Sequence, residues 1–150
     1  MNRLIGSVTL IATLLISGTG VTLAQAEPSL DEGERMAASG DIAGATQVYQ
    51  AVTEAQPESS EAFARLGGMQ LLGQQYAEAV KSFQHAISLG DDGARSFIGM
   101  GMAYLHMGAY GPARAAFTEA RARGSEHSAD VEDIITWLDS RDQDDLPPVR

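Results

Sequence analysis

Hydrophobic and small residues recur along the chain at a fixed interval of 34 positions. The segment "GAYGPARAAFTEARARG", which starts at Gly108, repeats the spacing of "QQYAEAVKSFQHAISLG", which starts at Gln74. A third copy precedes these two, so that Gly33, Gly67 and Gly101 occupy equivalent positions. Four further sets keep the same register: Ile42/Tyr76/Tyr110, Ala45/Ala79/Ala113, Tyr49/Phe83/Phe117 and Val52/Ala86/Ala120. This period is typical of stacked helical hairpins.

The pattern predicts three pairs of helices, over 28–39 and 42–55, 60–73 and 76–88, and 94–107 and 111–123. Glycine and alanine at fixed places allow two helices to approach closely, and the aromatic side chain fills the space beside them. A seventh helix is predicted over 128–140, with Trp137 packed against the third pair and an acidic outer face. Its expected role is to cap the stack, since one helix pair cannot bury its apolar face alone.

The spaced residues resemble the tetratricopeptide repeat family. The third copy reads Phe97-x₂-Met100-Gly101-x₂-Tyr104 and then Ala113-x₃-Phe117, and the second reads Phe63-x₂-Leu66-Gly67 and then Ala79-x₃-Phe83. The resemblance implies an all-α, right-handed solenoid within 27–140, with repeats at about 26–59, 60–93 and 94–127. Ser29 and Glu32 depart from the pattern in the first copy. Both suit an end repeat that faces solvent, or else a surface that packs on a partner.

The first 26 residues have the layout of a secretory signal peptide. A basic start is followed by an apolar stretch and by "AQA", which predicts cleavage after Ala26 and leaves no membrane span in the mature chain. The alternative is an uncleaved signal that anchors the protein in the membrane. The chain has no cysteine, so it is not lipidated there, and an exported protein without disulfides suits a periplasm.

Charge excludes one class of partner. The formal net charge is −10, and an acidic surface repels nucleic acid and anionic lipid. We therefore expect no nucleic-acid partner. The last ten residues, 141–150, are charged and contain two prolines, which predicts a disordered acidic tail.

No catalytic pattern emerges from the sequence, which predicts a non-enzyme without cofactor or resident metal. There is no cysteine nucleophile, and the glycines follow the repeat period instead of forming a phosphate loop. Met102 and His106 lie four residues apart on one helix face and are soft ligands of the kind that Cu(I) prefers. Two ligands are too few for a site without others, so a copper carrier is kept only as an alternative.

The resemblance also implies a binding groove, because in this family the first helix of each repeat lines a concave surface. Carried over by repeat position, the predicted groove residues are Leu30, Asp31, Glu34 and Ala38; Ala64, Arg65, Gly68, Leu71 and Leu72; and Arg95, Ile98, Met102, Leu105 and His106. Some family members hold a peptide's terminal carboxylate with clustered lysine and asparagine. This chain has one lysine, Lys81, outside the groove set, and no asparagine after Asn2, so that clamp is missing.

The sequence therefore predicts a non-catalytic scaffold in the cell envelope that binds a protein or peptide through apolar anchors. An amphipathic helix is one ligand that fits. The expected role is in the assembly or regulation of an envelope complex, by analogy with the family. Two alternatives stay open: the groove takes an end of a second copy to give a homo-oligomer, or its apolar residues are core, covered by the cap or by a second chain.

Overall fold

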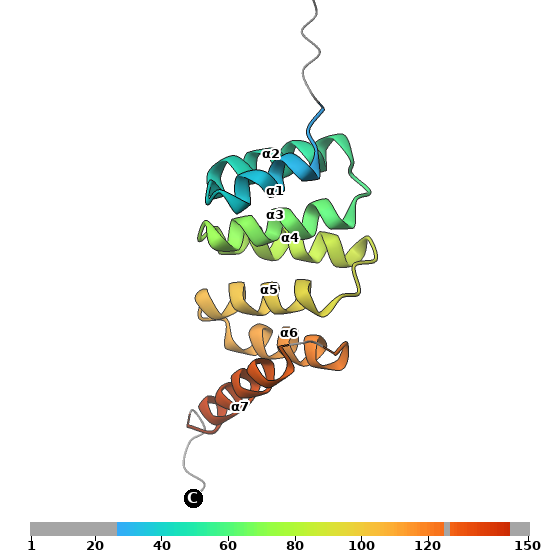
Figure 1. Ribbon diagram of the computed structural model, residues 1–150. Helices are drawn as coiled ribbons and strands as arrows, with labels where there is room; N and C mark the ends of the chain where they lie inside the picture. The colour runs from blue at the N-terminus through green and yellow to red at the C-terminus, as the bar shows by residue number, and fades with distance from the viewer. Residues whose placement is uncertain (1–26, 125–126, 145–150) are drawn as a thin grey trace, which may run out of the picture.

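The computed structural model describes residues 27–124 and 127–144 of the chain (Figure 1). The predicted signal peptide and residues 145–150 lie outside this part. Within it all regular secondary structure is helical, and the helices are α1 (Leu30–Ala38), α2 (Ile42–Ala55), α3 (Ser60–Leu72), α4 (Tyr76–Ser88), α5 (Ala94–His106), α6 (Tyr110–Ala122) and α7 (Ser128–Asp144). The six paired helices agree with the prediction to within two residues at each end.

The helices form three antiparallel pairs stacked in one direction, with α7 lying obliquely across the last pair (Figure 1). Each buried cluster joins a pair to the element that follows it. Tyr49 of α2 packs with Leu66 of α3, and Phe83 of α4 packs with Ala103 of α5. Phe117 of α6 packs in the same way with the apolar face of α7. This confirms the predicted stack of helical hairpins with a capping helix.

The three turns within the pairs repeat one conformation. Gly40, Gln74 and Gly108, each 34 residues from the next, all have positive φ, at 84°, 61° and 72°. One residue further on, the same backbone bond closes each turn, as between the Gln75 N–H and the Gln70 carbonyl at 2.8 Å. Glutamine takes the glycine position in the middle repeat because Gly73 stands one place early, and a non-glycine residue there costs about 1 kcal/mol.

Each repeat glycine lies against the aromatic ring of its own repeat. A Cβ added at Gly33 would lie 2.4 Å from the Tyr49 ring, and one added at Gly101 would lie 2.9 Å from the Phe117 ring. The Phe117 side chain is fully buried. Side chains at these positions would push the helices of a pair apart, which explains the register of small and aromatic residues along the sequence.

The cap is longer than predicted. Helix α7 continues to Asp144, so the first four residues of the predicted disordered tail are helical, and that part of the prediction is wrong. The Arg141 guanidinium lies 4.5 Å from the Tyr110 ring centroid and 5.0 Å from that of Trp137, which fixes the last turn on α6. An ion pair between Arg114 and Asp139 joins the same helices and lowers the pKa of the Asp139 carboxyl.

Among the described residues, no helix is both long enough and apolar enough to cross a bilayer.

Candidate functional site: a cleft across the first helices

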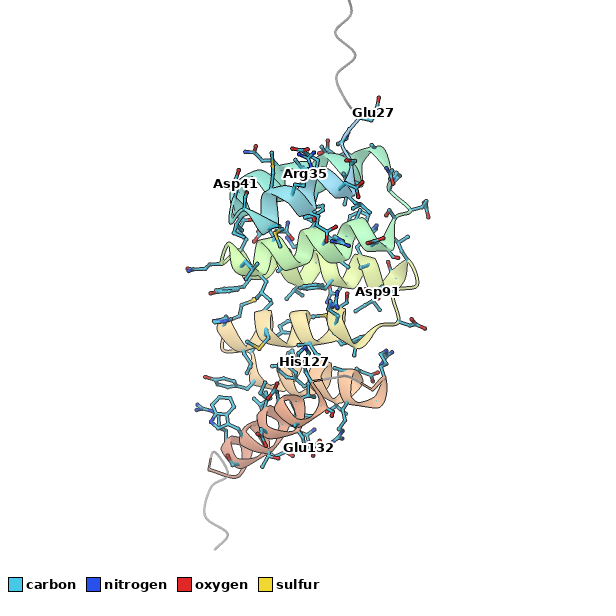
Figure 2. All side chains as sticks on the ribbon, viewed as in Figure 1. Glu27, Arg35, Asp41, Asp91, His127 and Glu132 are labelled. Carbon is cyan, nitrogen blue, oxygen red and sulfur yellow. The ribbon has the colours of Figure 1, made fainter. Side chains whose placement is uncertain are left out.

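A cleft of about 1150 Å³ crosses the first helices of the three repeats, α1, α3 and α5. It runs diagonally. Its lining begins with Glu34 and the last turn of α1, follows α3 over its whole length, and ends at the first half of α5 and at His127, just before α7. Asp91, in the α4–α5 connection, and His127 mark this far end (Figure 2).

The structure places ten of the fourteen predicted groove residues around this one cleft. They are Glu34, Ala38, Ala64, Arg65, Gly68, Leu71, Leu72, Arg95, Ile98 and Met102. The repeat register therefore brings together residues from three helices that are far apart in sequence. Their role in binding stays a prediction.

The other four predicted residues lie outside the cleft lining. Leu30 packs against the buried cluster around Tyr49, and Asp31 is exposed on α1. Leu105 packs against the cluster formed by α6 and α7, as expected for a residue that the cap covers. The exposed His106 ring is stacked on Tyr76, with ring centroids 4.6 Å apart and an interplanar angle of 3°.

Several lining residues escaped the prediction. They are Ala37, Tyr49, Ser60, Glu61, Met69, Phe83, Asp91, Gly93, Ala94, Ser96, Gly99, Gly124 and His127. Ser60 and Ala94 are equivalent first residues of α3 and α5. That equivalence is a signal in the repeat register from which this pair could have been found.

The middle of the cleft is apolar. The Leu72 residue is 62% exposed, the largest exposure among the large hydrophobic residues of the described chain that stand out as exposed. Leu71, Ile98 and Met102 are half-buried beside it. Exposed apolar surface in a concave site is an unusual cost for a monomer and marks candidate binding surfaces.

An ionic network occupies the α1 end of the cleft. The Arg65 guanidinium lies 2.9 Å from the Glu61 carboxylate and 3.5 Å from that of Glu34. The hydrogen bond to Glu61 raises the pKa of Arg65, burial opposes this, and Tyr49 and Glu34 add to the rise. With two carboxylates around one cation, this end carries a net negative charge.

The α5 end differs in its charges. Asp91 is half-buried and its carboxylate is occupied, since it accepts hydrogen bonds from the Ser96 hydroxyl and, at 3.1 Å, from the Gly93 N–H. Arg95 is exposed, and no acidic group of the described chain forms an ion pair with it. Helix α5 also begins without a side-chain cap and without an acidic residue in its first turn.

The two candidate copper ligands have different surroundings. Met102 lines the cleft and packs against the α6–α7 cluster, whereas the His106 ring stacks on Tyr76 outside the lining. No group of three or more histidine, cysteine, aspartate or glutamate residues that could hold a metal was found within 27–124 and 127–144.

Searches with family models and among curated proteins gave no match for this chain. Solved structures do match. The TPR2B domain of yeast Sti1, in a complex with an Hsp70 peptide, superposes with a TM-score of 0.68 at 16% identity, over 73% of this chain and 92% of that one. The Yersinia enterocolitica type III secretion chaperone SycD, with a peptide of the translocator YopD, gives 0.70 at 18% identity, over 73% and 88%. MamA gives 0.70 at 24% identity, over 78% and 68%.

These likenesses define the class of fold. The chain is an all-helical repeat solenoid with the architecture of tetratricopeptide repeat domains, which confirms the fold expected from the 34-residue period.

Proposed function

We propose that this protein is a non-catalytic interaction scaffold that binds an apolar segment of a protein or peptide in the cleft across α1, α3 and α5. The observation that carries the proposal is the position of Leu72, a large apolar side chain left 62% exposed in the middle of a concave surface. Burial of apolar area by a ligand would recover about 25 cal/mol for each Å² removed from water.

Solved structures of the same fold support this assignment. The Sti1 domain was solved with an Hsp70 peptide, SycD with a peptide of YopD, and PcrH with the chaperone-binding region of PopD. In the present chain the anchors are apolar. Leu71 and Leu72 of α3 face the cleft together with Ile98 and Met102 of α5. A ligand that presents residues at i, i+3 and i+4 of an amphipathic helix matches such a surface.

Export to the cell envelope belongs to the same proposal, with a role in assembling or regulating a complex there. It is supported by the signal-like segment before Glu27 and by the absence of cysteine from the sequence. Protein isolated from the envelope fraction of its own host should begin at Glu27. An N-terminus at Met1 would argue instead for an uncleaved anchor.

Two matched substitutions test the cleft. Leu72→Glu places a charge at the end of α3 inside the cleft. Met107→Glu places the same charge just after α5, outside the lining, at a residue that is also exposed, by 49%. Both side chains are exposed, so we expect the free energy of unfolding to change by no more than about 0.5 kcal/mol in each variant.

The measurement is capture of partners from envelope extract, quantified by mass spectrometry, with circular dichroism to check folding. A partner should be retained by wild type and by Met107→Glu, and reduced at least tenfold by Leu72→Glu. Equal capture by all three proteins would place binding elsewhere and remove the basis of the proposal.

A further inference from the structure

The two ends of the cleft differ in the charges that a ligand would meet. At the α1 end, the exposed carboxylates of Glu34 and Glu61 surround Arg65. At the α5 end, Arg95 extends without an ion-pair partner in the described chain, while the Asp91 carboxylate is occupied by Ser96 and Gly93. The surplus charge is therefore negative at one end, and the available charge is positive at the other.

The apolar anchors lie between these two ends. Leu71, Leu72, Ile98 and Met102 belong to α3 and to the part of α5 that follows Arg95. Packed helices are separated by about 8–10 Å, so two steps from α1 to α5 span roughly 20 Å. A helical ligand covers that distance with about 13 residues, and an extended one with about six.

We propose that the cleft selects a polarised segment, with an acidic side chain at the Arg95 end, a basic side chain at the Glu34 end and apolar residues between them. This rests on the proposed function and adds the chemical class of the ligand and its direction. Complementary charges at an interface fix register and exclude wrong partners, since like charges placed together cost several kcal/mol. A segment bound in reverse would place its acid against Glu34 and Glu61 and its base against Arg95.

The probe is a phage-displayed library of random 16-residue peptides, selected on purified full-chain protein. Wild type should enrich acidic residues at least threefold on one flank of the apolar positions, and basic residues on the other. Arg95→Glu should replace the acidic preference by a basic one. This variant is expected to fold, because Arg95 is exposed and a carboxylate in the first turn of α5 favours the helix.

Lys81→Glu is the matched control. It makes the same change of charge at an exposed residue of α4 outside the cleft lining, and it should leave the selected sequences unchanged. A selected peptide, synthesised with neutral termini, should bind Arg95→Glu about tenfold more weakly by fluorescence anisotropy. Exchange of its acidic residue for lysine should restore that affinity.

Two failures are distinguishable. If selected peptides depend on Leu72 but have the same charge pattern on wild type and Arg95→Glu, the inferred polarity is wrong and the binding cleft stands. If Leu72→Glu selects the same peptides as wild type, the cleft is not the binding site, and the inference fails together with the proposed function.

Discussion

The two junctions between repeats are built differently at one equivalent position. Where the first repeat meets the second, buried Tyr49 lies near Arg65, whose charge extends over the cleft floor. Where the second meets the third, the position 34 residues later is Gly99, and a Cβ there would lie 2.4 Å from the Phe83 ring. One junction places a long cation in the cleft, and the other leaves out the side chain altogether.

This difference shows how a regular repeat produces an irregular site. Tyr49 and Phe83 are equivalent, and each also packs on the glycine of its own repeat. The fold needs the ring and leaves the facing position free. At the first junction that position carries Arg65, which gathers Glu34 and Glu61 into an ionic network. At the second, its absence exposes an apolar floor, so the polar and apolar parts of the cleft follow from one repeat position.

Removal of the ring at the second junction should have the largest effect. Phe83 is 4% exposed and lies against glycines of both α3 and α5. Phe83→Ala should lower the free energy of unfolding by about 3–5 kcal/mol, because it leaves a cavity that neither glycine can fill. Urea denaturation followed by circular dichroism measures this. A loss near 1 kcal/mol, the size expected for an exposed position, would show that the junction collapses around the smaller side chain.

A pair of glycine substitutions should give an intermediate effect with opposite signs. Gly99→Ala forces a methyl group against Phe83, whose ring cannot retreat because Gly67 lies on its other side. We expect a loss of about 1–3 kcal/mol from overpacking. Gly68 lies inside α3, and a Cβ there would meet nothing within 4 Å. Gly68→Ala should therefore stabilise the protein by about 0.5–1 kcal/mol through helix propensity.

The same urea experiment compares the two variants. Equal effects of Gly99→Ala and Gly68→Ala would mean that Phe83 does not hold the second junction as tightly as the geometry indicates.

The sequence predicted what the repeat period controls. Helix bounds, the glycine–aromatic packing and ten cleft residues follow from register alone, because each depends on contacts that recur in every repeat. Leu105 and His106 could not be excluded from the lining in this way. Their surroundings depend on the path of α7 and on the stacking of one ring on Tyr76, and neither contact repeats. The extra turn of α7 was missed for the same reason, since Arg141 acts through rings brought together only by the fold.

The smallest effect is expected at the first junction, where the ring stays and only its hydroxyl is removed. The pKa of Arg65 is raised first by Glu61 and, against the effect of burial, also by the Tyr49 side chain. Tyr49→Phe should therefore cost about 0.5–1.5 kcal/mol, the usual net value of one hydrogen bond. Tyr49→Phe should cost less in an Arg65→Ala background, and a double-mutant cycle measures the coupling. A coupling of zero would mean that Arg65 is held by its carboxylates alone, so that both junctions depend on their rings for packing and differ only in the charge they present to the cleft.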